Sequence, residues 1–298
     1  MSKHIVMDAI ELKQKFSKIK SWQRNGERAP HKPLLLLYAL SRINRNETRL
    51  ISYSEAKDSL MHLLVEFGPN RRTTPRYPFI RLSNDGIWQI TGKKDIDTRH
   101  DWTEQIILEN ETMGGFTEEV YSLIFKDKNL IRELANIILE QNFPETMRED
   151  ILNEIGLDME LAVVQSRNPQ FRERILRAYE YRCAVCGFSV RLGNVLVAVE
   201  AAHIKWHQAG GPDIEDNGIA LCTMHHKLFD RGVFTISDNL KFQVSESAHG
   251  TVGFEEWLMK YHGENLRPPQ SPTYRPKDTY INWHFKEVFR GPTRYISD

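Results

Sequence analysis

The fold of this chain is decided by one stretch, residues 183–232, which reads CAVCGFSVRLGNVLVAVEAAHIKWHQAGGPDIEDNGIALCTMHHKLFDRG. It holds all three cysteines of the 298-residue sequence. Cys183 and Cys186 form a C-x-x-C turn, and Cys222 and His225 form a C-x-x-H turn further along the chain. Two such turns separated by a hairpin-length insert are typical of a closed, tetrahedral site for structural Zn²⁺. The spacing therefore predicts that these four residues bind zinc.

A second set of polar residues is interleaved with the predicted zinc ligands. A run rich in β-branched residues, VLVAVEAAH, ends at His203, and a loop containing glycine and proline leads from it to Asn217. A short strand, residues 219–221, is then expected to enter a helix that carries His225 and His226. Neighbouring residues of a helix point about 100° apart. His225 can therefore face the zinc while His226 faces a different site.

This order of strand, loop, strand and helix resembles the HNH, or ββα-metal, nuclease fold. The pieces AAH, NG-x-x-L-C and HH-x-x-FD-x-G match the branch found in modification-dependent restriction enzymes, over about residues 165–235. The resemblance implies hydrolysis of a phosphodiester bond with the help of Mg²⁺, Mn²⁺ or another divalent ion. It implies that His203 is the general base, that Asn217 orients it and ties the loop, and that His226 binds the catalytic ion. Asp230, one turn beyond His226, could complete the ion's ligands or support them.

One position departs from that pattern. Members of the family often place an acidic or histidine ligand just before the base, where this chain has Ala202. Glu200, two residues earlier, is another ligand that the sequence offers at this strand. The complete ligand set of the catalytic ion is therefore left open.

The N-terminal part is predicted to be a helical, winged-helix-like domain. Helices are expected over residues 7–20, around the apolar run Leu34–Leu37, and over residues 54–67. Two strand-like runs, residues 79–82 and 87–90, are separated by Ser-Asn-Asp-Gly, which predicts a β-hairpin. With the nuclease domain, this assigns the whole chain to the α+β class.

Two motifs of this part, HKPLLLLYAL and RYPFIRLSNDGIW, resemble the sulfur-binding domain of modification-dependent restriction endonucleases, over roughly residues 8–160. That family recognises phosphorothioated DNA, in which sulfur replaces a non-bridging phosphate oxygen. Because sulfur is less hydrated than oxygen, apolar contact favours it, and the resemblance implies an apolar pocket rimmed by cations. It assigns two residues to the walls and three to the rim: Tyr77 and Pro78, then His31, Lys32 and Arg81.

Charge is unevenly distributed along the chain. Residues 1–110 have a net charge of +6, residues 111–165 of −8 and residues 166–298 of +2, although the total is zero. Ordinary solvated surfaces would explain this distribution, but so would a basic module that binds DNA beside an acidic connector that DNA repels. Arg71 and Arg72, just before the predicted hairpin, are expected to contact phosphates.

We expect two domains: residues 1–160 for DNA binding, including the acidic helical connector, and residues 161–298 for the nuclease, with a C-terminal tail that wraps over it. No apolar run is long enough to span a membrane and the N-terminus does not resemble a signal peptide, so a cytoplasmic protein is expected. Its predicted partner is double-stranded, phosphorothioated DNA. Because one HNH site cuts one strand, double-strand cleavage predicts a homodimer.

Two alternative functions remain open on the sequence. An HNH endonuclease could instead recognise a methylated or hydroxymethylated base, for which Tyr77, Trp88 and Trp102 are the aromatic residues available. The chain could also be a zinc-stabilised DNA-binding protein without catalytic activity. Such a protein would have no need of the histidines and the asparagine of the HNH pattern, which counts against it.

Overall fold

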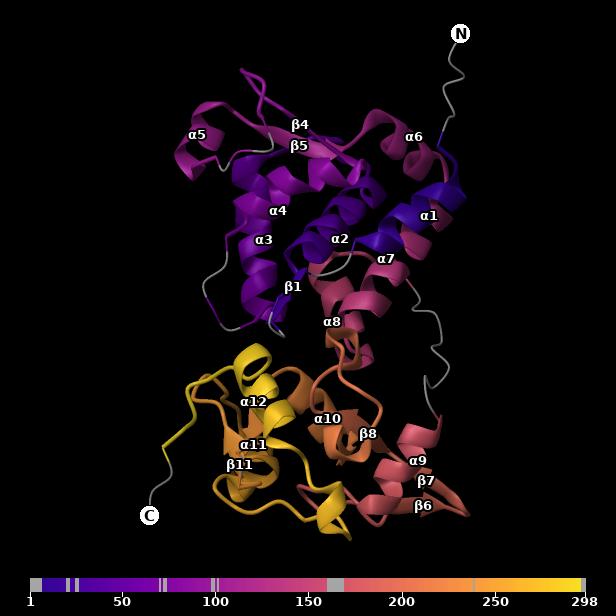
Figure 1. Cartoon of the computed structure of the whole chain (residues 1–298), viewed down its shortest axis with the longest axis vertical. Coiled ribbons are helices and arrows are strands. Elements are labelled where there is room, and N and C mark those ends of the chain that lie inside the picture. Colours follow the sequence, from indigo (N-terminus) through magenta and orange to yellow (C-terminus); the bar gives the residue numbers. More distant parts are fainter. Residues whose placement is uncertain are drawn as a thin grey trace. The chain divides into compact units, whose positions relative to one another are not determined.

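The computed structural model divides into two compact units, residues 1–162 and 163–298 (Figure 1). Both units combine helices with short antiparallel strands, which confirms the predicted α+β class. No helix of the described segments is long and apolar enough to cross a membrane. The segments that the structure describes are residues 7–19, 22–24, 27–69, 71, 74–97, 100, 102–159, 169–237 and 239–295.

In the first unit, a small antiparallel sheet lies along one side of a group of helices (Figure 1). The sheet has the strand order β3-β5-β4, and β1 and β2 form a separate antiparallel pair. The helices are α1 (Ala9–Lys18), α2 (His31–Asn44), α3 (Tyr53–Phe67), α4 (Arg76–Arg81), α5 (Glu104–Glu109), α6 (Glu118–Lys126), α7 (Lys128–Asn142) and α8 (Glu145–Ile155). The strands are β1 (Trp22–Arg24), β2 (Glu27–Ala29), β3 (Ile51–Ser52), β4 (Trp88–Thr91) and β5 (Met113–Phe116).

Helix α2 is central to the first unit. Leu34, Leu35, Leu36 and Leu37 are all completely buried, because the helix packs against α3, α4, α7 and α8. A helix that is apolar all round is stable only where neighbours cover every side. The prediction of a central helix around this run is therefore confirmed.

The expected hairpin is wrong. Residues 79–82 lie in α4 and in the 3₁₀ turn that follows it, and only the second run forms a strand, β4, which pairs with β5. Pro78 occupies the first turn of α4, where the missing N–H of proline costs no helical hydrogen bond. Phe79 packs edge-on against Tyr53 and Trp88. A short buried apolar run of this kind looks the same in sequence whether it is helical or extended.

The second unit contains the expected ββα arrangement. Strands β8 and β9 pair antiparallel with His203 opposite Gly218, and α10 follows β9 directly. The expected strand over residues 195–203 is interrupted at Ala198, whose φ of 57° is left-handed. The elements of this unit are α9 (Pro169–Ala178), β6 (Val190–Leu192), β7 (Val195–Val197), β8 (Val199–His203), β9 (Gly218–Cys222), α10 (Thr223–Asp230), β10 (Phe234–Ile236), β11 (Phe242–Val244), α11 (Val252–Trp257) and α12 (Asp278–Glu287).

The C-terminal segment returns to the ββα arrangement. The backbone N–H of Lys277 donates to the carbonyl of Asp216 at 3.0 Å, and α12 packs against β10. Gly232 ends α10 with a φ of 71°, and a Cβ atom there would lie 2.1 Å from the carbonyl oxygen of Val288. A glycine is therefore required where α10 meets the C-terminal segment.

Candidate active site, metal centre and DNA interface

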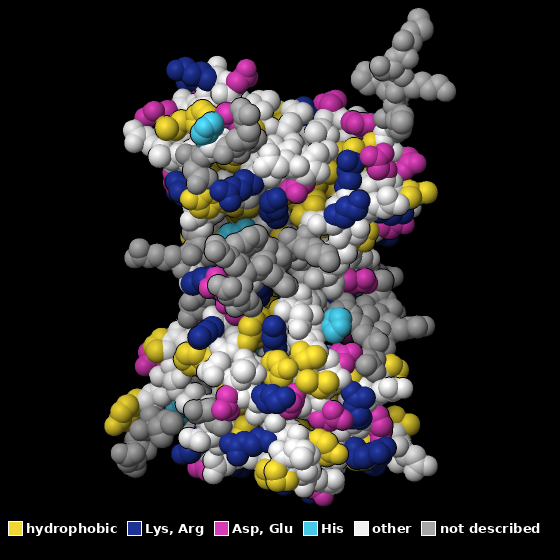
Figure 2. Space-filling model, viewed as in Figure 1, with side chains coloured by type: hydrophobic (Ala, Val, Ile, Leu, Met, Phe, Trp, Pro, Cys, Tyr) yellow, Lys and Arg dark blue, Asp and Glu magenta, His cyan; other side chains and the backbone are white. Residues whose placement is uncertain are grey.

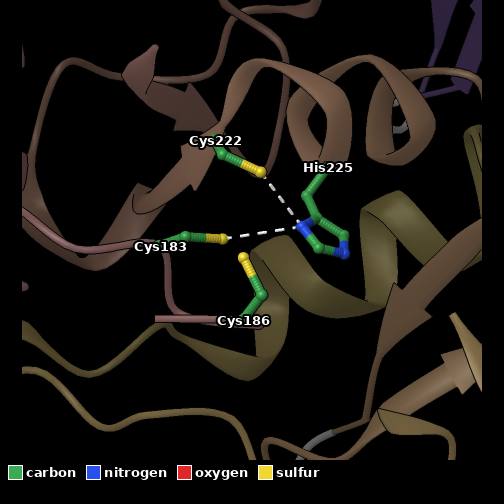
Figure 3. A group of neighbouring side chains, drawn as sticks. All are labelled: Cys183, Cys186, Cys222 and His225. Carbon is green, nitrogen blue, oxygen red and sulfur yellow. Dashed lines mark hydrogen bonds between the residues drawn. The ribbon is translucent and has the colours of Figure 1, made fainter. Parts of the chain in front are cut away.

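The four predicted zinc ligands converge on one point (Figure 3). Cys183 and Cys186 come from the turn after α9, Cys222 ends β9, and His225 lies in α10. One ligand atom from each residue lies within 4.8 Å of all the others. Nδ1 of His225 is 3.1 Å from Sγ of Cys222 and 3.7 Å from Sγ of Cys183. A tetrahedral zinc ion would separate nitrogen and sulfur ligands by about 3.6 Å, so the donor set and its spacing fit this metal. We call these four residues the Cys3His cluster.

The protein holds the Cys3His cluster in a state that suits a metal. Nε2 of His225 lies 2.9 Å from the carbonyl oxygen of Trp257, which places the ring proton on Nε2 and the lone pair of Nδ1 among the sulfurs. Hydrogen bonds from Cys186 and Cys222 hold the pKa of the Cys183 thiol well below its usual value. A thiolate is the form of cysteine that binds metal.

His226 faces a different environment from His225, as predicted for adjacent residues of a helix. Its Nδ1 lies 2.6 Å from Oε2 of Glu200, and its Nε2 lies 3.3 Å from Oδ2 of Asp230. The hydrogen bond with His226 lowers the pKa of the Glu200 carboxyl. The two carboxylates therefore contact opposite nitrogens of one imidazole ring.

Asp230 and Glu200 differ in how they are held. Asp230 is almost completely buried, and its Oδ1 accepts a hydrogen bond from Nε1 of Trp206 at 2.9 Å. The side chain of Glu200 is 41% exposed. Glu200 can therefore give up its contact with His226 to bind an ion, whereas Asp230 is held by both His226 and Trp206.

His203 ends β8 and is held in a definite orientation. Its ring stacks on Phe171 with 4.1 Å between the ring centroids and an interplanar angle of 14°. Its Nε2 lies 2.8 Å from Oδ1 of Asp213. Burial lowers the pKa of the His203 imidazole, and the hydrogen bond to Asp213 offsets this effect only in part. The ring is therefore neutral at neutral pH, which a general base requires.

Asn217 ties the loop, as the sequence predicts, but its amide does so entirely through main-chain atoms. Its Oδ1 accepts from the N–H of Lys205 at 2.9 Å, and its Nδ2 donates to the carbonyls of Lys205 and Pro212, each at 3.0 Å. The side chain contact to His203 comes from Asp213 instead. Sequence reasoning missed Asp213, and the available signal was an acidic residue directly after Gly-Gly-Pro in a loop that Asn217 closes.

Two residues of the predicted sulfur pocket lie in one depression of the first unit. Helix α4 presents Tyr77 and Arg81 one turn apart. The guanidinium carbons of Arg76 and Arg81 each lie 4.7 Å from the centroid of the Tyr77 ring. The depression therefore combines apolar surface with positive charge. It is lined by Arg76, Tyr77, Ile80, Arg81, His100 and Trp102.

Other residues predicted for the pocket are not among those that line this depression. Pro78 is buried within α4, and Nζ of Lys32 forms an ion pair with Oδ2 of Asp85 at 2.5 Å. Arg72 lies outside the described residues. On the face of each unit in Figure 2, the Lys and Arg side chains of the described residues are interspersed with acidic ones.

The charge of Arg71 acts on the pKa of His31. His31 begins α2, and burial together with the nearby charge of Arg71 lowers its pKa to about 4. Nη2 of Arg71 donates to the carbonyl oxygen of Arg28 at 2.6 Å. His31 is therefore neutral at neutral pH, so on the predicted polar rim it can supply hydrogen bonds but no positive charge.

Comparisons with known proteins identify both units. Residues 9–160 match the family described as ScoMcrA-like, DNA sulfur-binding domain, and residues 183–237 match the family described as HNH endonuclease. A search of curated proteins found no match.

Solved structures similar to the chain include two sulfur-binding domains. The sulfur-binding domain of SprMcrA complexed with phosphorothioated DNA is 20% identical with a TM-score of 0.44, over 51% of this chain and 95% of that one. The corresponding domain of ScoMcrA is 21% identical with a TM-score of 0.42, over 49% and 94%. The modification-dependent TagI restriction endonuclease is 25% identical with a TM-score of 0.29, over 41% and 38%. Because the sulfur-binding family matches just over half of the sequence, the chain belongs to the ScoMcrA-like DNA sulfur-binding domain family, and it joins that domain to an HNH endonuclease domain.

Proposed function

We propose that this protein is a restriction endonuclease that binds phosphorothioated DNA through its first unit and hydrolyses a phosphodiester bond nearby with its second. The observation that carries the catalytic part is the placement of His203 at the end of β8 of the ββα arrangement, where its ring stacks on Phe171 and its Nε2 lies 2.8 Å from Oδ1 of Asp213. Hydrolysis forms a bond between the oxygen of water and phosphorus and breaks one phosphorus–oxygen bond of the backbone. His203 accepts the proton that the attacking water releases.

The catalytic ion is proposed to bind at Glu200 and His226. Without an ion, Nδ1 of His226 shares a proton with Glu200 at 2.6 Å, and Nε2 lies 3.3 Å from Oδ2 of Asp230. A divalent ion bound between Nδ1 and Glu200 would replace that proton, and Nε2 would then keep its proton on the side of Asp230. A site with one carboxylate oxygen and one imidazole nitrogen is less selective for Mg²⁺ than a site made of oxygen ligands alone. We therefore expect it to accept Mg²⁺, Mn²⁺ or another divalent ion. Such an ion supplies charge stabilisation at the phosphate oxygens. Asp230 then orients His226 and is not itself a ligand.

The Cys3His cluster is proposed to bind structural zinc. Its four ligands leave no open position for a substrate, which is the pattern of structural zinc sites. Zinc there fixes the turn after α9 to the start of α10. It therefore supports the catalytic residues without taking part in the reaction.

The depression at Tyr77 is proposed to bind the phosphorothioate. Sulfur carries less hydration than oxygen, so the Tyr77 ring and Ile80 accept it at low cost. Arg76 and Arg81 supply charge to the remaining oxygens. His31, which is neutral, and Arg71 are proposed to contact the adjacent backbone, along with Lys32 and Arg72.

Recognition of a modified base is the competing proposal. It requires a cage of aromatic side chains around a flipped base. Trp88 is buried and packs edge-on against Phe79 and Phe116, so it cannot line a cage. Tyr77 and Trp102 alone line the depression among the aromatic candidates, and this favours the sulfur.

One experiment separates these functions. Matched plasmids that are unmodified, methylated or phosphorothioated are incubated with the protein and Mg²⁺ or Mn²⁺, and nicked and linear products are measured. We expect cutting of the phosphorothioated plasmid only. Inertness towards all three would exclude the endonuclease, and cutting of the methylated plasmid alone would exclude the sulfur specificity. Linear product would accord with the proposed homodimer, which sedimentation tests directly.

The sulfur pocket has its own test. Tyr77→Ala should weaken binding of phosphorothioated DNA roughly tenfold, because the lost ring is worth about 1–2 kcal/mol of apolar contact. Tyr121→Ala is the matched control, since Tyr121 stacks on Phe125 in α6 and does not line the depression. Equal loss of affinity in the two variants would contradict the assignment. Binding is measured by titration with phosphorothioated and unmodified duplexes of one sequence.

A further inference from the structure

Asp213 is the side chain that forms a hydrogen bond with the ring of His203. Its Oδ1 lies 2.8 Å from Nε2 of His203. A carboxylate can only accept a hydrogen bond, so Nε2 carries the ring proton and Nδ1 carries the lone pair. In the part of the chain that the structure describes, Nδ1 of His203 makes no hydrogen bond. The nitrogen that can accept a proton is therefore the one that the protein leaves available.

The loop that carries Asp213 is held at this residue and at the two residues before it. The amide of Asn217 donates to the carbonyl of Pro212 at 3.0 Å. Asp213 itself accepts a hydrogen bond at its main-chain oxygen from Nη2 of Arg174 at 2.7 Å. A Cβ atom at Gly211 would lie 1.8 Å from the carbonyl of Lys205, so only glycine lets the loop close here. The carboxylate is thus held in place by its backbone.

The charged and titratable groups near His203 act in opposite directions on its pKa. Asp213 raises it through the hydrogen bond and through its charge, whereas His207 and His226 lower it. Burial against Phe171 and the strand is the largest effect and lowers it. The result is a ring that is neutral at neutral pH but retains a carboxylate to stabilise the imidazolium formed during catalysis.

We infer that Asp213 is a positioning residue of the nuclease, which holds His203 in the Nε2–H tautomer and presents Nδ1 to the attacking water. This inference rests on the proposed function, because it assigns to His203 the role of general base. It also gives Asn217 a definite role. Asn217 acts on His203 through the loop and Asp213, since its three side-chain hydrogen bonds all go to main-chain atoms of Lys205 and Pro212.

The test compares Asp213→Asn with Glu215→Gln in the full-length protein. Glu215 is a carboxylate of the same loop, and its Oε1 pairs with Nε of Arg174 at 2.9 Å. Glutamine keeps an oxygen that can accept from Arg174, so the control removes a negative charge from the loop and leaves the contact between Asp213 and His203 in place. Cutting of phosphorothioated DNA is measured from pH 5 to pH 9 at saturating divalent ion. We expect Asp213→Asn to lower the plateau rate roughly 10²- to 10⁴-fold, the range that a general base contributes, because the asparagine amide can hold His203 in the wrong tautomer.

The pH profile separates positioning from a general loss of structure. The rate rises with pH as His203 loses its proton, so the acid limb reports the pKa of this residue. Removal of the Asp213 charge lowers that pKa, and the acid limb of Asp213→Asn should therefore move to lower pH. Glu215→Gln should keep the acid limb of the wild type. An unchanged rate in Asp213→Asn, or a lower rate with an unmoved acid limb, would overturn the inference.

A second measurement does not depend on cutting. The ¹⁵N shifts of the His203 ring nitrogens report the tautomer directly. We expect the Nε2–H form in the wild type and a mixture of tautomers in Asp213→Asn. If the wild type cuts no DNA, the proposed function fails while this measurement still decides the tautomer. An Nδ1–H ring in the wild type would overturn the inference even if cutting is observed.

Discussion

The Cys3His cluster and the proposed catalytic site meet at two adjacent residues of α10, yet they are built in different ways. His225 is completely buried, with Nδ1 among the sulfurs and Nε2 against a main-chain carbonyl. The His226 side chain remains 16% exposed and is held by two carboxylates. At the structural site, both ring nitrogens of the histidine thus have partners within the protein. Catalysis requires groups that are oriented by the protein but still able to exchange partners.

Loss of a cluster ligand should have the largest effect of any single change in the second unit. Cys222→Ser should abolish zinc binding and unfold this unit, because structural zinc is worth about 10–16 kcal/mol in small domains, as much as a typical domain's whole stability. The first unit has its own core and should keep its unfolding transition. Zinc content and calorimetry of the full chain measure both. His226→Ala is the control and should retain zinc; retention of zinc and of both transitions by Cys222→Ser would contradict the assignment.

His203→Ala should have the next largest effect, on rate alone. Removal of a general base typically lowers a rate about 10²- to 10⁴-fold, whereas zinc content and affinity for phosphorothioated DNA should not change, because neither depends on this ring. His207→Ala is the control, since its ring lies 6.0 Å from that of His203, and it should retain most of the activity. If His203→Ala instead lost zinc or its folded state, the proposed separation between the two sites would fail.

Glu200→Gln should change the need for divalent ion and leave zinc in place. An amide is a poorer ligand than a carboxylate, so roughly 10- to 100-fold more Mg²⁺ or Mn²⁺ should be needed for half-maximal cutting, by comparison with losses at other metal sites. A high ion concentration should restore much of the rate. Glu215 pairs with Arg174, and the control variant Glu215→Gln should leave the ion requirement unchanged. A rate that no ion concentration restores would assign Glu200 a role other than ion binding.

The sequence predicted the second unit better than the first, for a physical reason. Metal ligands and turn glycines have spacings that only a few backbone geometries satisfy. The C-x-x-C and C-x-x-H turns therefore led directly to the Cys3His cluster, and the adjacent histidines to two separate environments. The helical run around Leu34–Leu37 was equally clear because it is apolar on every side.

The errors arose where tertiary contacts decide between local alternatives. Residues 79–82 are too short a run to show helical or strand periodicity, and all but Arg81 are buried. Packing of Phe79 on Tyr53 and Trp88 accompanies the helical form. Asp213 was missed because it reaches His203 across a loop of ten residues. Spacing along the chain does not reveal such a contact. It does not reveal the lowered pKa of His31 either, because that shift results from burial and from the charge of Arg71.

The smallest expected effect comes from substituting the tryptophans that orient His226 and His225. This comparison distinguishes the catalytic site from the Cys3His cluster, because only one of the two tryptophans acts through its side chain. Trp206 donates from its side chain to Asp230, so Trp206→Phe removes one hydrogen bond worth about 1 kcal/mol and should raise the required ion concentration roughly fivefold. Trp257 holds His225 through its main-chain oxygen, which phenylalanine also supplies. Trp257→Phe should therefore change neither zinc content nor ion requirement. Equal responses of the two variants would show that the orienting contacts are not what sets His226 apart from His225, because only one of the two substitutions removes such a contact.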